Sequence, residues 1–158
     1  EIMPSLVGSE MCIRDRDSIA HRMECSGNLN FAASAILNGD RQKATKAAIS
    51  LADSVENACL IVFTRRGLAA TQAAVLRPER AAIFAFSNDP VVVRQLALAR
   101  DVTAFESPFL KDPARMISTA LDLLKEKGLI SSGQPVVIQG DSLQGELLAD
   151  SIIFMRVE

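Results

Sequence analysis

The chain has 158 residues, 49% of them hydrophobic, a length and composition that suit one compact domain with a sizeable core. Its 17 basic and 19 acidic side chains give a formal net charge of -2, so the strongly basic character of nucleic-acid or anionic-membrane binders is missing. No apolar run approaches the roughly 20 residues needed to cross a bilayer. We therefore expect no nucleic acid and no membrane among the partners of this protein.

The three cysteines, Cys12, Cys25 and Cys59, are widely separated and odd in number. None forms a CxxC pair, and none joins His21 at the spacing of a zinc site. This pattern favours a reduced compartment, so we expect a cytoplasmic protein without a metal site. No GxGxxG or GxxxxGK[ST] motif follows an apolar run, so the signatures of dinucleotide folds and P-loops are missing.

Residues 1–16 form a segment that fits poorly with the rest of the chain. They show no clear hydrophobic period, and their sequence is similar to translated library-adapter sequence that occurs at the ends of unrelated reading frames. We expect this segment to be extraneous or disordered, with a genuine flexible terminus as the alternative. A short helical piece follows over residues 17–25 and stops at Ser26-Gly27-Asn28.

From residue 40 onward, apolar runs of strand length alternate with amphipathic stretches. Asp40 is expected as the N-cap of a helix that reaches Val55, and Cys59–Phe63 is typical of a strand covered on both faces. The next elements are a turn, a short helix and a second buried strand, at residues 64–67, 68–76 and 81–86. This order predicts a βαβ unit with parallel strands.

The second half of the chain repeats the pattern. Asp89-Pro90 and Asp112-Pro113 each supply a cap followed by proline in the first helical turn, and Gly128 is placed to end the second helix. The remaining strands are expected at residues 102–105, 136–138 and 152–157. A short connection without a helical stripe joins the last two strands, so we expect the final strand to be antiparallel.

Residues 40–158 are therefore expected to form one α/β domain. Strands that alternate with helices predict three layers, α/β/α, around an open and mainly parallel sheet of about five strands. The pattern fixes the fold class but leaves the order of the strands in the sheet open.

Several stretches of this domain resemble the carboxy-terminal α/β domain of pyruvate kinases, in the same order and at the same spacing. The first strand with its turn, CLIVFTRRGLAA, the pair Arg77-Pro78 and the strand AIFAF are similar to consecutive family motifs. Residues 93–98 resemble the helix before the third strand. Residues 133–138 resemble a valine-rich strand, with Gln134 in place of an aspartate. The series covers residues 44–157.

The resemblance implies the C-terminal regulatory and oligomerisation domain of an enzyme that converts phosphoenolpyruvate and ADP to pyruvate and ATP in glycolysis. Residues 17–39 would be a remnant of the barrel-closing helix and a linker. The catalytic groups of the family lie on a barrel that this fragment lacks, so we expect no catalytic residue here and no activity by the fragment alone. Magnesium and potassium are implied only for the parent enzyme. Its partners would be its own barrel domain and the other subunits of a homotetramer.

In regulated pyruvate kinases this domain binds a phosphorylated effector at the turn after the first strand, which here is Thr64, Arg65, Arg66 and Gly67. A turn that leads into a helix N-terminus presents N–H donors and partial positive charge to an anion. Arg66 and Ala69 stand where the family typically carries hydroxyl side chains, so hydrogen bonds are lost and a cation is gained.

A later loop, residues 140–146, is where effector-binding relatives supply further contacts, and its Asp141 and Glu146 would repel a second phosphate. Two interpretations of the turn therefore remain, a site for a monophosphorylated effector and a purely structural turn. For the whole chain, the alternative is a free-standing flavodoxin-like module that binds a phosphorylated metabolite, because a fold does not determine function.

Overall fold

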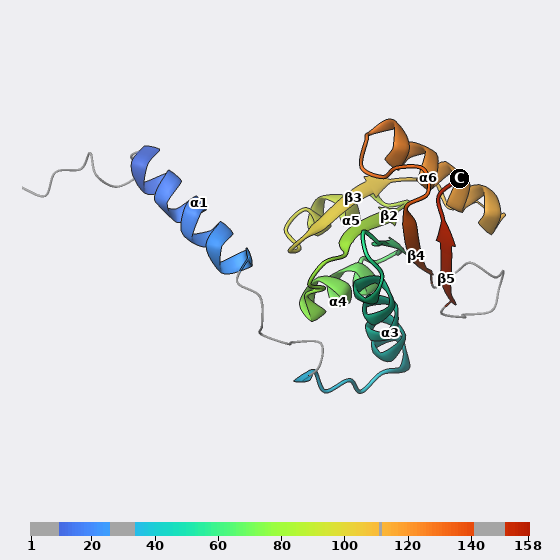
Figure 1. Ribbon diagram of the computed structural model, residues 1–158, viewed down its shortest axis with the longest axis horizontal. Coiled ribbons are helices and arrows are strands. Elements are labelled where there is room, and N and C mark those ends of the chain that lie inside the picture. Colours follow the sequence, from blue (N-terminus) through green and yellow to red (C-terminus); the bar gives the residue numbers. More distant parts are fainter. Residues whose placement is uncertain (1–9, 26–33, 111, 141–150) are drawn as a thin grey trace, which may run out of the picture. The chain divides into compact units, whose positions relative to one another are not determined.

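The computed structural model describes residues 10–25, 34–110, 112–140 and 151–158 (Figure 1). The chain divides into two compact units, residues 1–30 and 31–158, and each is described here by itself. No helix among the described residues is long and apolar enough to cross a membrane.

The first unit contains helix α1 (Glu10–Cys25). This helix begins inside the segment that we expected to be extraneous or disordered, so the boundary expected after Arg16 falls within a regular helix. The helical piece expected over residues 17–25 is the second part of α1. Its first part was not predicted, because residues 10–16 contain good helix formers such as Glu, Met and Arg but show no apolar period. The turn expected at residues 26–28 lies outside the described residues, and the foreign origin of residues 1–16 stays a prediction.

The second unit is an α/β domain with a single five-stranded sheet in the order β3-β2-β1-β4-β5. Strands β1 to β4 are parallel and β5 is antiparallel to β4, which confirms the predicted fold class and the direction of the last strand. The helices are α3 (Asp40–Ser54), α4 (Leu68–Leu76), α5 (Pro90–Leu96) and α6 (Pro113–Glu126). The strands are β1 (Cys59–Phe63), β2 (Ala82–Ser87), β3 (Val102–Glu106), β4 (Pro135–Gly140) and β5 (Ser151–Arg156).

The helices lie on both faces of the sheet, as a three-layer fold requires. Helices α3, α4 and α5 pack into one apolar cluster, and α6 packs into a second cluster on the opposite face (Figure 1). The chain proceeds along the sheet from β1 to β3 and then crosses back to β4. Because crossovers keep one hand, this reversal of direction places α6 on the face opposite α4 and α5.

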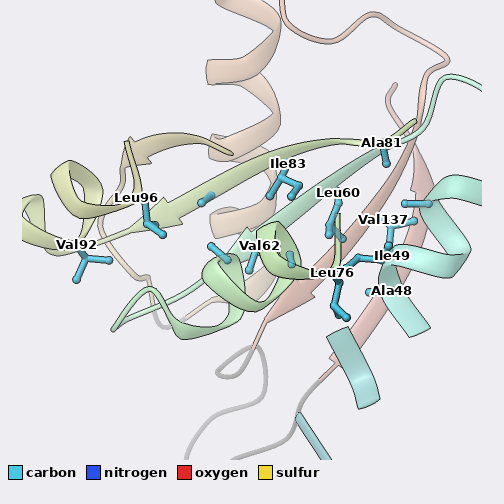
Figure 2. Close-up of a cluster of buried hydrophobic side chains, with 14 residues drawn as sticks. Ala48, Ile49, Leu60, Val62, Leu76, Ala81, Ile83, Val92, Leu96 and Val137 are labelled. Atoms are coloured by element: carbon cyan, nitrogen blue, oxygen red, sulfur yellow. The ribbon is translucent and has the colours of Figure 1, made fainter. Parts of the chain in front are cut away.

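Strand β1 forms the centre of the domain. All five of its residues are buried, and their side chains alternate between the two clusters. Leu60 and Val62 pack with α3, α4 and α5, and Figure 2 shows them among side chains from helices and neighbouring strands. Cys59, Ile61 and Phe63 pack on the side of α6. Burial on both faces explains why this strand is an unbroken apolar run rather than an alternating one.

Aspartate side chains cap the start of α5 and of α6. Asp89 accepts a hydrogen bond from the N–H of Val91 at 2.8 Å, and Asp112 accepts one from the N–H of Ala114 at 3.0 Å, as the Asp-Pro pairs predicted. The expected cap at Asp40 was wrong by one residue. Gly39 is the N-cap of α3. Its N–H donates a hydrogen bond to the side-chain oxygen of Gln42 at 3.3 Å, and this bond fixes the start of the helix at Gly39.

A carboxylate ties the end of α3 to the segment that enters β2. Asp53 Oδ1 accepts hydrogen bonds from the N–H groups of Arg80 and Ala81, and Oδ2 accepts one from Glu79, each at 3.0 Å. Bonds from N–H groups to an ionised carboxylate are stronger than bonds between neutral groups. Three backbone donors that precede β2 are thereby satisfied by one side chain, which fixes where the strand begins.

Gly67 stands in a position that no other residue fits well. Its φ is +77, in the left-handed region, and a Cβ added here would lie 3.2 Å from Val92 Cγ1 and 3.5 Å from Leu96 Cδ2. The missing side chain therefore lets the turn after β1 lie against α5. Gly128 has a similar φ of +67, but no atom lies within 4 Å of the position of its missing Cβ.

We predict that Gly67→Ala lowers the free energy of unfolding by more than Gly128→Ala does. Both substitutions carry the backbone cost of a left-handed residue, about 1–2 kcal/mol, and only the first also crowds Val92 and Leu96. Urea denaturation followed by far-ultraviolet circular dichroism measures both, since the chain has no Trp or Tyr for fluorescence. Equal losses for the two variants would contradict this account of Gly67.

Candidate functional site

The candidate site lies at the carboxyl end of β1, where the connections of the sheet change direction. Strand β1 pairs with β2 on one side and with β4 on the other, and the chain leaves these two neighbours in opposite directions along the sheet. In open α/β sheets, ligands bind in the crevice outside such a switch point. The turn at residues 64–67 occupies this position. The loop with Asp141 and Glu146, predicted to contribute to the same site, lies outside the described residues.

Thr64 continues the ladder of β1 beyond its last strand residue. Its N–H donates to the carbonyl of Phe86 at 2.9 Å, and the residue is only 3% exposed. The hydroxyl of Thr64, which was predicted to contact an effector, is therefore buried. It lies at the carboxyl ends of the strands, next to Ser87 on β2. Ser87 is also buried, and its Oγ accepts from the N–H of Asp89 at 3.3 Å.

The two arginines of the turn are exposed, but they differ in their surroundings. The guanidinium carbon of Arg65 lies 6.0 Å from the ring centroid of Phe109, a cation–π contact. The Phe109 ring in turn meets the ring of Phe63 edge-on, with centroids 6.5 Å apart. Arg66 has neither a ring contact nor an ion pair within the part of the chain that the structure describes. The turn thus carries two positive charges, of which one is held against an aromatic ring.

Helix α4 begins without a side-chain cap, unlike α5 and α6. Gly67 is its N-cap, and the first bond of the helix runs from the N–H of Thr71 to the carbonyl of Gly67 at 2.9 Å. The N–H groups of residues 68–70 come before this bond, so they have no acceptor within the helix. Their donors and the positive end of the helix dipole lie beside the two arginines, an arrangement suited to an anion.

Two buried polar groups near the carboxyl edge were not found by sequence reasoning. Ser107 follows β3 and is 4% exposed, and its Oγ has no hydrogen-bond partner among the described residues. Gln139 near the end of β4 donates through Nε2 to Thr45 Oγ1 at 2.8 Å, while its Oε1 has no partner within that same set of residues. Neither residue belongs to a motif, so only the three-dimensional arrangement reveals them.

Phe109 was also missed, because a single aromatic residue in a loop carries no local signal. Its contact with Arg65 joins segments that follow two different strands, β1 and β3, and those strands are not neighbours in the sheet. Knowledge of the strand order, which the sequence left open, would have been needed to bring these segments together.

The thiol of Cys59 is buried in β1 and is not poised to react. Burial raises the pKa of the Cys59 thiol to about 11, and a hydrogen bond from the backbone only partly offsets this, so the thiol stays neutral and poorly nucleophilic near pH 7. No group of three or more His, Cys, Asp or Glu side chains that could hold a metal ion occurs within the described ranges.

Comparison with known proteins identifies the family. A family profile described as "Pyruvate kinase, alpha/beta domain" matches residues 42–150, more than half of the chain. Pyruvate kinase isozyme A, chloroplastic, from Nicotiana tabacum is 30% identical over 112 residues, which cover 71% of this chain and 19% of that protein. Pyruvate kinase from Eimeria tenella is 32% identical over 99 residues, covering 62% of this chain and 18% of that protein. The chain thus spans about a fifth of the length of these relatives.

Solved structures with the same fold agree with this match. A pyruvate kinase from Cryptosporidium parvum superposes with a TM-score of 0.68 at 24% identity, covering 78% of this chain and 24% of that chain. The Cryptosporidium parvum pyruvate kinase in complex with ADP gives a TM-score of 0.69 at 23% identity, covering 91% and 27%. At these identities the likeness establishes the fold. The profile match over residues 42–150 establishes the family, and this chain belongs to the pyruvate kinase α/β domain family.

Proposed function

We propose that this chain serves as the regulatory and assembly domain of a pyruvate kinase and does not catalyse phosphoryl transfer by itself. The observation that carries the proposal is the family match over residues 42–150, in a chain that covers about a fifth of its relatives. The parent reaction would convert phosphoenolpyruvate and ADP to pyruvate and ATP. In that enzyme, magnesium and potassium would act on the barrel, since phosphoryl transfer depends on metal ions and positioned charges around the migrating group.

The regulatory part of the proposal concerns the turn at residues 64–67, taken as a site for a monophosphorylated effector. Its support is the uncapped start of α4, whose free N–H donors lie beside Arg65 and Arg66. Two cations and a helix N-terminus favour a phosphate dianion. Thr64 is buried, so its hydroxyl would reach the ligand only after a small movement of the turn.

The assembly part of the proposal is carried by strand β5. Among the described strands, β5 is an edge of the sheet, and its side chains alternate between the core and solvent. Ile153 and Met155 pack inward, whereas Ile152 and Phe154 are 37% and 46% exposed. An edge strand with apolar outer side chains is prone to pair with another strand. We therefore assign β5 to contact with a second copy of the chain, as expected for a homo-oligomer.

For the parent enzyme we keep the cytoplasm as the proposed compartment, as expected from the cysteine pattern of the sequence. Several curated relatives are named as chloroplastic isozymes, from Nicotiana tabacum, Ricinus communis and Arabidopsis thaliana. The family therefore occurs in more than one compartment, and fractionation of the source cells decides between them.

We predict that residues 17–158 form no pyruvate from phosphoenolpyruvate and ADP in a coupled assay with magnesium and potassium. The same gene extended upstream is expected to be active, because the extension would supply the metal-binding carboxylates. Activity of the short chain would overturn the non-catalytic assignment. Inactivity of both proteins would favour a free-standing module that binds a phosphorylated metabolite.

We predict that ribose 5-phosphate and AMP shift the amide resonances of residues 64–70 in a titration followed by nuclear magnetic resonance. Fructose 1,6-bisphosphate should bind no more tightly, because carboxylates in the later loop would repel its second phosphate. Arg66→Gln should weaken binding about three- to tenfold through loss of a charge-assisted contact. If all three ligands leave these resonances unchanged at millimolar concentration, the turn is structural.

We predict that Phe154→Glu shifts the protein toward the monomer, because a charge on the outer face of β5 opposes pairing of two edge strands. Size-exclusion chromatography with light scattering measures the mass against 17.0 kDa for one chain. Val75→Glu is the matched control, since Val75 is also exposed but lies on α4. A similar decrease in molecular mass in both variants would contradict the assignment of β5 to the contact between two chains. A wild type that is monomeric at high micromolar concentration would contradict it as well.

A further inference from the structure

Arg65 differs from Arg66, the other charged residue of the turn, because its guanidinium contacts an aromatic ring. Its guanidinium carbon lies 6.0 Å from the centroid of the Phe109 ring, and no carboxylate of the described residues forms an ion pair with it. The ring attracts the cation through its quadrupole without neutralising its charge. The contact favours one placement of the Arg65 guanidinium and leaves its charge available to an anion.

The ring of Phe109 is itself anchored to the core. It meets Phe63 edge-on, with centroids 6.5 Å apart and planes at 72°. Phe63 then continues through Phe86 to Phe105, each pair 5.4 Å apart, in a row across β1, β2 and β3. Phe63 and Phe86 are almost fully buried, so the row is fixed by the packing of the sheet. Phe109 extends this fixed row to the carboxyl edge, where the turn lies.

We propose that Phe109 is a positioning residue for phosphate binding, which holds the Arg65 guanidinium over its ring beside the N-terminus of α4. This inference rests on the proposed effector site and names one residue that would set its affinity. A free arginine side chain loses rotamer freedom when it binds a ligand, and a side chain already held on a ring loses less. The five N–H donors lie in the guanidinium plane, so a contact with one face leaves them available to phosphate oxygens.

The ligand class that fits is a phosphate monoester. Arg65, Arg66 and the N–H groups at the start of α4 supply donors and positive charge for one phosphate group. Phe109 lies in the segment after β3, a long way along the sequence from the turn, so the site would join the ends of β1 and β3. Removal of the ring should therefore weaken binding without removing any group that contacts the ligand.

The experiment uses the whole chain and five variants, Phe109→Leu, Phe109→Tyr, Arg65→Gln, the double variant Phe109→Leu/Arg65→Gln and the control Leu110→Ala. Ribose 5-phosphate and inorganic phosphate are the probes, and amide resonances of residues 64–70 report binding. We expect Phe109→Leu to weaken binding of ribose 5-phosphate about two- to fivefold, a change of the size that exposed cation–π contacts contribute. Phe109→Tyr keeps the ring and should bind like the wild type.

Two readouts separate positioning from general damage to the fold. In the Arg65→Gln background, Phe109→Leu should cause no further loss of affinity, because the ring would have no cation to hold. Leu110→Ala is the control for the segment, since Leu110 is an exposed neighbour without a ring. An equal loss from Phe109→Leu with and without Arg65, or an equal loss from Leu110→Ala, would overturn the proposal.

The contact can be measured without any ligand, which distinguishes failure of this inference from failure of the proposed effector site. Side-chain protons of Arg65 should show a ring-current shift in the wild type and in Phe109→Tyr that is lost in Phe109→Leu. If neither ribose 5-phosphate nor inorganic phosphate binds the wild type, the effector site is refuted, and with it the effect of Phe109 on affinity. The ring-current shift still shows in that case whether Arg65 contacts Phe109. If the shift is absent from the wild type, Phe109 does not position Arg65.

Discussion

The burial of β1 on both faces and along both edges is the constraint on which the rest of the domain depends. A strand with no exposed side needs a parallel neighbour on each edge and helices above and below it. The domain meets this need with β2 and β4 as neighbours, with α3 and α4 on one face and with α6 on the other. The chain runs from β1 to β2 and β3 on one side and then crosses back to β4 on the other, and this reversal creates a switch point beside the carboxyl end of β1.

The geometry of the turn after β1 follows from the same packing. Gly67 has no side chain, so α4 can begin directly against Val92 and Leu96 of α5. A left-handed glycine at this point also leaves α4 without the side-chain cap that Asp89 and Asp112 provide to the later helices. The first N–H groups of α4 therefore have no acceptor within the helix, and the arginines of the preceding turn add positive charge that favours an anion.

Local patterns in the sequence predicted the elements of this domain well, because each is encoded by neighbouring residues. The apolar run Cys59–Phe63 and the Asp-Pro caps specify a strand and two helix starts without reference to the rest of the chain. The strand order could not be predicted, since pairing of β1 with β4 depends on contacts between distant segments. The contact between Arg65 and Phe109 was missed for the same reason. The part of helix α1 over residues 17–25 was predicted, but its start at Glu10 was missed because an exposed, charged helix lacks the apolar stripe by which helices are recognised.

Under the proposed function, the arrangement of the sheet places the candidate effector turn close to the candidate assembly edge. Only β4 separates β1, which leads into the turn, from β5. A well-packed parallel sheet deforms little, so ligand binding at the turn is not expected to bend these strands. Coupling between the two sites would instead require a movement of the whole domain against its neighbours, with different contacts at β5 in each state. An anion at the turn would then regulate the enzyme by favouring one arrangement of subunits over another, rather than by changing the fold of this domain.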